Sequence, residues 1–261
     1  MPGVSDVAVV SAGAALVGAV WGVLLPTLVY RYAVLWPDGE PRPPWRRACA
    51  TCSEPLPPWW RPSLSRLSVR CRSCGARLGP SRWLTVPLSA GVCGLLGAVF
   101  GARTDLPAFM LLALLGVLLG VVDAAVLRLP DPLVRATAVA GVVMLTVPAL
   151  LSGQPNLIVR AFAAAVVCGI AYGAFALLPG SPLGYGDAKL GVVLGFFLGW
   201  LGWSTVLAGL VFAPIANAPI LLGLIATGRA GRKTLVPYGP AMLVGALAAI
   251  VVSVLRQRTH G

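Results

Sequence analysis

Residues 181–205 read SPLGYGDAKLGVVLGFFLGWLGWST, so that one acid and one lysine, Asp187 and Lys189, directly precede a long apolar run. Most of the chain follows the same alternation of short polar and long apolar stretches. Of its 261 residues, 58% are hydrophobic and 11% are charged, whereas an ordinary soluble domain is about 25% charged. Many apolar runs approach or exceed the ~20 residues that a helix needs to cross a bilayer. The sequence therefore predicts an all-α polytopic membrane protein.

Eight candidate membrane spans divide the apolar sequence. The first is too long for the apolar core of a signal peptide and has no basic residue before it, so we expect it to be retained. The sixth and seventh run almost continuously, and only the segment GWLGWST suggests a turn between them. No internal repeat is convincing. The expected spans are about residues 7–30, 84–101, 106–127, 133–151, 158–179, 190–205, 207–226 and 237–255.

Lysine and arginine set the expected orientation, because they concentrate on the cytoplasmic loops of membrane proteins. With the N-terminus outside, sixteen of the twenty basic residues fall on the inner side and four on the outer side. The net charge of +12 then suits a basic cytoplasmic surface beside anionic membrane lipids. We therefore expect lipids as partners and no nucleic acid.

The segment 31–83 is the one sizeable part outside the expected spans, and it is too poor in aliphatic residues to build a core without a staple. Two C-x2-C pairs, with 18 residues between them, have the spacing of a zinc ribbon. Four thiolates suit a closed tetrahedral zinc site. Two disulfides are the alternative, but they rarely persist in the cytosol. The expected zinc ligands are Cys49, Cys52, Cys71 and Cys74.

Two acids stand out because they lie in or beside apolar runs. If the third span begins near Pro107, Asp123 lies about 24 Å along its axis, just inside the cytoplasmic edge of a ~30 Å hydrocarbon core. Asp187 lies in the expected loop before the sixth span, on the same side. We therefore expect the two carboxylates to meet at one depth. The alternative is a structural ion pair, with Asp123 neutralised by Lys189 or Arg128.

Two acids, Asp131 and Asp187, also have simpler structural explanations. Asp131 precedes Pro132, and this order is typical of a helix N-cap followed by the first helical residue. Asp187 is equally able to cap the sixth span. Gly184 and Gly186, however, permit positive φ angles and the close approach of another chain. Such an acid suits a site that receives an extended peptide.

The residue types limit the chemistry that the site can perform. The only histidine is His260, one residue from the end, which argues against a Ser-His or Cys-His triad. Two neighbouring carboxylates hold one proton between them, so that one acts as base and the other as acid. Peptide-bond hydrolysis is the economical interpretation. A proton-coupled transporter is the alternative, although such a protein usually has broken helices and an inverted repeat.

Four motifs, in order, resemble those of the type IV prepilin peptidases, a family of intramembrane aspartic proteases. They are the paired cysteine motifs, VDAAVLRLPDPL, GYGDAKLG and LVPYGPAMLVGAL, and the resemblance covers nearly the whole chain. It implies removal of the short basic leader of type IV prepilins or pseudopilins at the cytoplasmic face of the bacterial inner membrane. It also implies three parts: a first transmembrane helix (1–30), the zinc loop (31–83) and a peptidase domain (84–261).

The resemblance assigns roles to individual residues. It implies that Asp123 and Asp187 form the catalytic pair. The supporting residues that it implies are Asp131, Gly184, Gly186 and Lys189.

Many bacterial members of that family also N-methylate the new N-terminus with S-adenosylmethionine. Where the family has a glutamate at the start of the second span, this chain has Val86 or Pro87. The family's NIP element is replaced by PPWWRP. Methylation is therefore left open, as is a purely structural role in a pilus machine.

Overall fold

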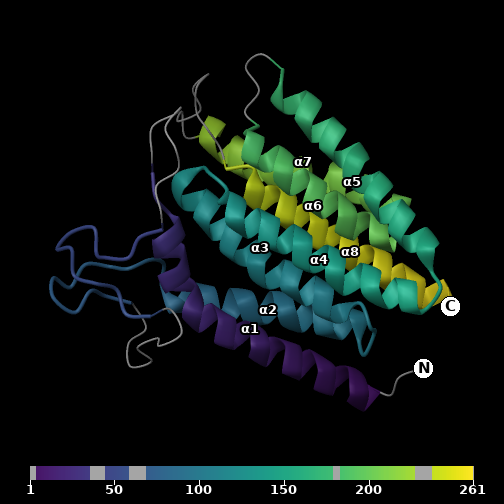
Figure 1. Cartoon of the computed structure of the whole chain (residues 1–261), viewed down its shortest axis with the longest axis horizontal. Coiled ribbons are helices and arrows are strands. Elements are labelled where there is room, and N and C mark those ends of the chain that lie inside the picture. The colour runs from purple at the N-terminus through teal and green to yellow at the C-terminus, as the bar shows by residue number, and fades with distance from the viewer. Residues whose placement is uncertain (1–3, 36–44, 59–68, 179–182, 227–236, 261) are drawn as a thin grey trace. The chain divides into compact units, whose positions relative to one another are not determined.

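The computed structural model of the protein describes residues 4–35, 45–58, 69–178, 183–226 and 237–260. Over these residues the chain forms eight α-helices and no β-strand (Figure 1). Six of the helices are long and apolar enough to cross a membrane, which confirms a multi-pass all-α protein. The helices are α1 (Val4–Tyr32), α2 (Arg82–Phe100), α3 (Leu106–Val126), α4 (Asp131–Leu151), α5 (Pro155–Ala176), α6 (Tyr185–Leu201), α7 (Trp203–Ala226) and α8 (Gly239–His260).

The two helices outside that set of six are α6, which has 17 residues, and α7, whose described apolar part is Trp203–Pro219. The chain divides into two compact units, Met1–Leu106 and Pro107–Gly261. The first unit holds α1, α2 and the cysteine loop, and the second holds α3 to α8.

In the first unit, α1 and α2 form a close antiparallel pair. The hydroxyl of Ser11 donates to the carbonyl of Gly94 across 2.9 Å, and that of Thr85 donates to the carbonyl of Gly22 across 2.8 Å. A Cβ atom on Gly22 would lie 2.6 Å from the carbonyl oxygen of Thr85. Glycine therefore lets the two backbones touch, as is common between membrane helices.

In the second unit, α5 and α6 are joined in the same way. A Cβ on Gly195 would lie 2.7 Å from the Cβ of Cys168. One turn earlier on α6, Gly191 packs against the ring of Tyr172. One turn later, Gly199 packs against the side chain of Ala164. The contacts run in opposite directions along the two helices, so the start of α6 lies beside the end of α5.

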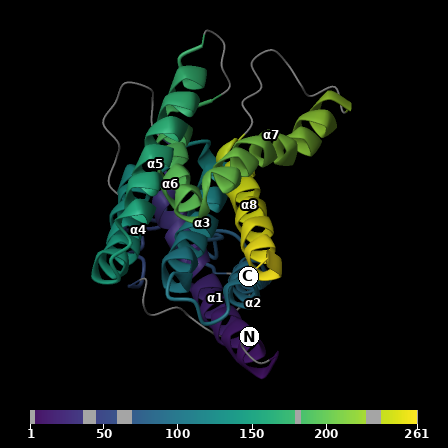
Figure 2. The ribbon, with the colours of Figure 1, turned by 90° about the vertical axis from the view of Figure 1, so that its right-hand side faces the viewer.

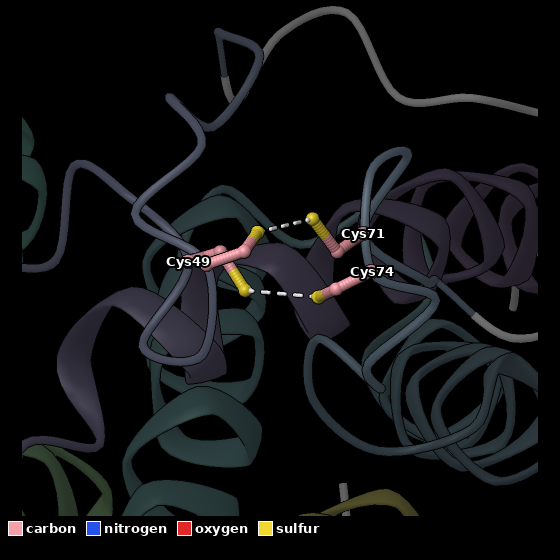
Figure 3. Close-up of side chains that lie close together, drawn as sticks. Cys49, Cys71 and Cys74 are labelled. Carbon is pink, nitrogen blue, oxygen red and sulfur yellow. Dashed lines mark hydrogen bonds between the residues drawn. The ribbon is translucent and has the colours of Figure 1, made fainter.

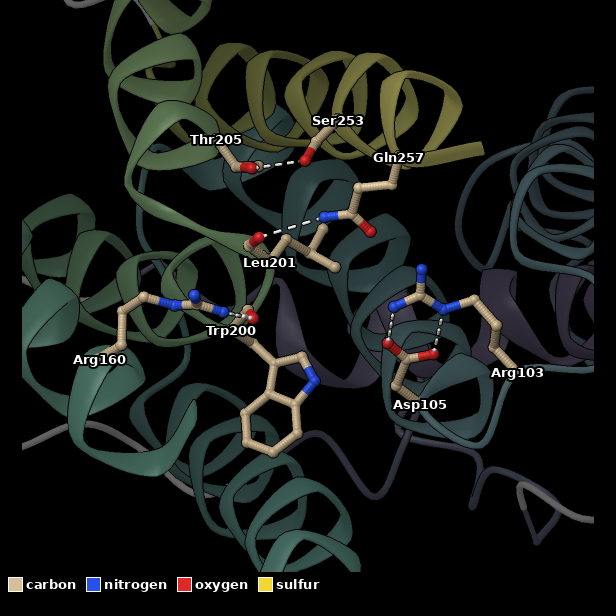
Figure 4. A network of polar contacts seen from close by, with 8 residues as sticks. All are labelled: Arg103, Asp105, Arg160, Trp200, Leu201, Thr205, Ser253 and Gln257. Atoms are coloured by element: carbon tan, nitrogen blue, oxygen red, sulfur yellow. Dashed lines mark hydrogen bonds and ion pairs between the residues drawn. The ribbon is translucent and has the colours of Figure 1, made fainter. Parts of the chain in front are cut away.

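The break between α6 and α7 falls at Gly202, inside the segment GWLGWST where the sequence suggested a turn, and a few residues before the expected end of the sixth span. Gly202 has φ 144° and ψ 165°, a backbone conformation that favours glycine. Arg160 donates to the carbonyls of Gly199 and Trp200 at 2.8 and 2.6 Å (Figure 4). The side-chain amide of Gln257 donates a hydrogen bond to the carbonyl of Leu201. These donors satisfy the last carbonyls of α6, which would otherwise lack partners.

Candidate active site and metal centre

Asp187 lies in the first turn of α6, because this helix begins at Tyr185. The sequence placed it in a loop, and that expectation was wrong. Its Oδ2 accepts a hydrogen bond from the N–H of Gly184 across 3.1 Å, so the carboxylate does cap the helix. Its Oδ1 is buried and has no hydrogen-bond partner among the described residues. Buried carboxylate oxygens are normally paired, so this one is available to a water molecule or a substrate.

Asp123 lies in the last turn of α3, and 4% of its surface is exposed. Its Oδ2 accepts the N–H of Gly239 across 3.1 Å. Because Gly239 begins α8, the carboxylate lies at the positive end of a helix dipole. A Cβ on Gly239 would lie 2.8 Å from this oxygen, so the contact requires glycine.

The structure brings Asp123 and Asp187 to one end of the second unit, close enough for their charges to interact. Both side chains are buried, at 4% and 8% exposure, although 64 positions of sequence separate them. Each carboxylate lies at the N-terminus of a helix, that of Asp123 at α8 and that of Asp187 at α6, where a negative charge is favoured. The arrangement can hold one proton between two carboxyl groups.

Two tyrosines next to this pair were not predicted as site residues. Tyr172 of α5 and Tyr238, which precedes α8, both interact electrostatically with Asp187. Tyr238 belongs to the motif LVPYGPAMLVGAL, so its motif was available as a signal. Tyr172 lies within an apolar span, and only the packing of α5 against α6 reveals it.

The glycines before Asp187 act through space and not through unusual backbone angles. Gly184 has φ −83° and ψ 158°, and Gly186 lies within the helix, so the expected positive φ is wrong for both. Gly186 does allow a close approach: a Cβ there would lie 3.2 Å from the Cβ of Leu129. The segment before α4 therefore packs directly on the start of α6.

Asp131 does not cap α4 with its side chain. The helix begins at Asp131 itself, Pro130 takes the capping position, and no side-chain cap bond forms, so the expected N-cap is wrong. The carboxylate of Asp131 instead accepts a hydrogen bond from Lys189 across 2.8 Å. The expected alternative in which Lys189 neutralises Asp123 is therefore not what the structure has.

The four cysteines of the first unit form a compact cluster, which could hold a metal ion. Their sulfur atoms all lie within 4.8 Å of one another. Two sulfur pairs, Cys49 with Cys74 and Cys52 with Cys71, are 3.7 and 3.5 Å apart (Figure 3). Ligands 2.3 Å from a tetrahedral ion would be about 3.8 Å apart. The donor set and its spacing therefore fit a tetrahedral metal.

Each cysteine pair lies in a turn of the same design, a local repeat that the sequence did not reveal. The carbonyl of Cys49 accepts a hydrogen bond from the N–H of Ser53, and the N–H of Cys49 donates to the carbonyl of Glu54. In the second turn, the carbonyl of Cys71 accepts from the N–H of Gly75, and the N–H of Cys71 donates to the carbonyl of Ala76. A β-bridge closes each turn, Ala48 with Pro55 and Arg70 with Arg77. Ser53 and Gly75 take equivalent left-handed conformations, with φ 59° and 73°.

The turns also favour the thiolate form of Cys49 and Cys71, whereas burial and the three neighbouring cysteines raise the pKa of Cys52. The backbone N–H groups of Thr51 and Cys52 lower the pKa of Cys49 to about 6. The N–H groups of Cys74 and Ser73 likewise lower the pKa of Cys71. Since the thiolate is the form that binds a metal, these backbone donors prepare Cys49 and Cys71 for binding.

The loop is anchored to the end of α1. Arg31 donates to the carbonyls of Pro57 and Arg46 at 2.7 and 3.3 Å, and its guanidinium lies over the ring of Trp45. The hydroxyl of Tyr30 accepts the N–H of Ala50 across 2.8 Å. The metal-ligand turns are thereby fixed to a helix of the same unit.

Several known proteins resemble the chain in sequence. Over 214 residues it is 31% identical to "Prepilin leader peptidase/N-methyltransferase" of Burkholderia pseudomallei strain 1026b, an alignment that covers 78% of this chain and 66% of the relative. The protein of the same name from Aeromonas hydrophila is 29% identical over 227 residues, 82% of this chain and 76% of the relative. The protein of the same name from Aeromonas salmonicida strain A449 is 29% identical over 210 residues, which cover 79% of this chain and 71% of the relative.

The chain thus spans a little under two thirds of the length of the Burkholderia relatives that it matches. No protein-family model matches the chain. No solved structure matches it either.

Proposed function

Since this chain belongs to the prepilin leader peptidase family, we propose that it is an intramembrane aspartic endopeptidase. It removes the short basic leader of type IV prepilins or pseudopilins at the cytoplasmic membrane face. The observation that carries this proposal is the pair of buried, interacting carboxyls, Asp123 and Asp187. A transporter finds no support among the relatives, all of which are named as peptidases.

In the proposed reaction, the two aspartates activate one water molecule. The ionised carboxylate takes a proton from this water, and the protonated carboxyl donates to the carbonyl oxygen of the scissile peptide bond. The water oxygen bonds to the carbonyl carbon. The carboxyl that accepted the proton of the water then gives a proton to the departing amine as the C–N bond breaks, and the other carboxylate takes back a proton from one of the two hydroxyls on that carbon. Oδ1 of Asp187 is suited to meet the water, because it alone of that carboxylate's oxygens has no partner among the described residues.

The surroundings of the pair support this assignment. Gly239 and Gly184 each donate one backbone N–H to a carboxylate oxygen, Oδ2 of Asp123 and of Asp187. These bonds fix the orientation of the two carboxyls before a substrate arrives, and a preorganised site avoids reorganisation during the reaction. Gly186 and Lys189 support the site through the packing on Leu129 and the ion pair with Asp131.

The metal of the cysteine loop is zinc in this proposal, and its role is structural. Four cysteine thiolates make a closed site with no open coordination position. Zinc would join the two turns that hold Cys49 and Cys71 and so stabilise a segment with few other buried apolar residues. The loop (31–83), the first helix (1–30) and the peptidase domain (84–261) are the proposed functional parts.

In the proposed orientation the chain lies in the bacterial inner membrane with the cysteine loop and the aspartates at the cytoplasmic side. Lysine and arginine concentrate on that side. The proposed partners are prepilin or pseudopilin substrates and the surrounding lipids.

N-methylation of the new N-terminus is the second candidate function, because the names of the relatives include it. The chain differs from the family's pattern where α2 begins, with Val86 or Pro87 in place of a glutamate. Incubating the purified protein with a cleaved pilin peptide and labelled S-adenosylmethionine tests this activity. Transfer of the label establishes it, and its absence under conditions that allow cleavage excludes it.

The peptidase proposal is tested by incubating purified protein with a synthetic prepilin peptide that has a basic leader and a Gly-Phe junction. Cleavage at the junction supports the proposal. If the intact, folded protein leaves such peptides uncut, a structural role in a pilus machine replaces it.

A further inference from the structure

Asn217 is a half-buried polar residue in the apolar helix α7, and the site described above does not use it. Its Oδ1 is buried and has no hydrogen-bond partner among the described residues. It lies between Pro214 and Pro219 in the sequence APIANAPI. Polar side chains within membrane helices are expensive and are usually functional.

The packing of α7 against α8 indicates the face of α7 on which Asn217 lies. Three contacts repeat at intervals of four residues, so the two helices are antiparallel and one face of α7 follows α8. Asn217 is the next residue on that face, and continuing the same register places it opposite Ala241. The contacts are Thr205 with Ser253 (Figure 4), Gly209 with Ala249, and Ala213 with Gly245.

This register places Asn217 close to the depth of the aspartates. Ala241 follows Gly239 by two residues, which is about 3 Å along a helix axis. Gly239 donates its N–H to Asp123. Asn217 therefore lies within about one helical turn of the depth of the Asp123 carboxylate.

Two backbone acceptors accompany the side chain. Pro214 and Pro219 have no N–H to donate to the carbonyls of Leu210 and Ile215, four residues earlier. Leu210 also lines a small cavity together with Tyr172 of the site. In Figure 2 the C-terminal half of α7 diverges from α5 and α6. The carbonyls of Leu210 and Ile215 therefore lack their usual α-helical donors.

Cleavage of a membrane-inserted peptide creates a need for such acceptors. A peptide bond within a helix must be unwound before water can attack it, and unwinding frees backbone N–H and C=O groups. In an apolar environment each unpaired group costs several kcal/mol. The enzyme must therefore supply hydrogen-bond partners beside the two aspartates.

We propose that Asn217 is a substrate-positioning residue whose amide hydrogen-bonds the backbone of the peptide segment unwound for cleavage beside Asp123 and Asp187. The proposal rests on the peptidase function proposed above. The amide binds main-chain groups and not side chains, so it serves different leader sequences equally well.

The first test compares Asn217→Ala with wild type on the synthetic prepilin peptide. We expect KM to rise about tenfold, the loss of about one hydrogen bond in a buried site, while kcat and its pH profile change much less. Ser253→Ala is the matched control, because it removes a polar group from the same helix interface at its far end. We expect this variant to cleave as wild type does.

The second test measures the backbone contact itself. A series of prepilin peptides carries an ester in place of one amide near the junction, which removes a single N–H. Binding is measured with Asp187→Asn protein, with and without Asn217→Ala, so that no cleavage occurs. In the protein that retains Asn217, we expect the ester at one position to weaken peptide binding about tenfold. In the protein with Asn217→Ala, the same ester should leave binding unchanged.

Each result decides the proposal. Coupling between one ester position and Asn217 supports it. If every ester weakens binding equally in both proteins, or if Asn217→Ala leaves KM unchanged, Asn217 does not position the substrate. If Asn217→Ala does not fold, Asn217→Ser and Asn217→Gln replace it in the same ester series. Wild-type protein that cleaves no prepilin peptide contradicts the proposed function instead.

Discussion

Lys189 of α6 donates a hydrogen bond to Asp131 of α4 across 2.8 Å, and this ion pair joins two motifs that lie 58 residues apart. Both side chains are about half exposed, at 53% and 49%. The pair belongs to the same unit as Asp123 and Asp187, but its charges are satisfied by each other. Its expected role is to hold the starts of two helices together.

Because the pair is exposed, we expect only a small effect from breaking it, about 1 kcal/mol or less in stability. Asp131→Asn and Lys189→Gln should each retain cleavage within a few-fold of wild type and accumulate to a lower level in the membrane. Exchanging the two residues should restore the level. Complete loss of cleavage by stably folded Asp131→Asn would show that this acid takes part in the reaction.

Replacing either member of the buried pair should have a much larger effect. We expect Asp123→Asn and Asp187→Asn to reduce leader cleavage by at least about a hundredfold, since each removes an acid–base group. Membrane insertion should be unchanged, because the amide is neutral and similar in size. Asp6→Asn, at the start of α1, is the control. Full cleavage by both site variants would refute the aspartic mechanism.

Gly239→Ala should disturb the site without removing any functional group. The new Cβ would lie 2.8 Å from Oδ2 of Asp123, so the carboxylate must move. A displacement near 1 Å costs about a hundredfold in rate, and we expect kcat to fall to a similar degree. Gly173→Ala is the control, because nothing lies within 4 Å of its Cβ position. Equal activity of the two variants would mean that this contact does not position Asp123.

Metal analysis of the purified protein should find about one zinc ion per chain, as one four-thiolate site requires. Cys49→Ser combined with Cys52→Ser should abolish it. Cys93→Ala, a change in the buried part of α2, should not. A metal-free preparation in which the loop keeps its fold would argue against a structural zinc site.

The two metal-ligand turns allow a paired test of their equivalent positions. Ser53 has φ 59° without the freedom of glycine, which costs about 1–2 kcal/mol. Ser53→Gly should therefore preserve or raise the resistance of zinc to a chelator. Gly75→Ala, at φ 73°, should lower it. The same response to both changes would show that the backbone angles do not limit metal retention.

The sequence predicted the helices well because hydropathy and bilayer thickness determine them directly. The meeting of Asp123 and Asp187 also followed from the rise of a helix and the side of each residue. The turn at Gly202 lies inside the segment GWLGWST that suggested it, but the expected end of the sixth span was a few residues too late because apolar residues continue on both sides of the turn. The start of α6 was missed because Asp187 and its glycines look like loop residues, although here they form a helical turn.

Other features depend on packing that the sequence does not display. Tyr172 and Asn217 lie in helices that are apolar on every side, so no periodicity marks the face that meets a neighbour. The backbone N–H of Gly239 carries no side-chain signal. The repeat of the two turns is a repeat of hydrogen bonds, with few letters in common.

Gly202 also determines how often the chain changes direction. Tyr185–Ala226 as one helix would be about 63 Å long, twice the thickness of the hydrocarbon core. The reversal at Gly202 instead returns the chain, so that α8 starts on the same side as α6. The N-termini of both helices thus converge on Asp187 and Asp123, and a residue at the opposite end of α6 fixes the electrostatic environment of both acids.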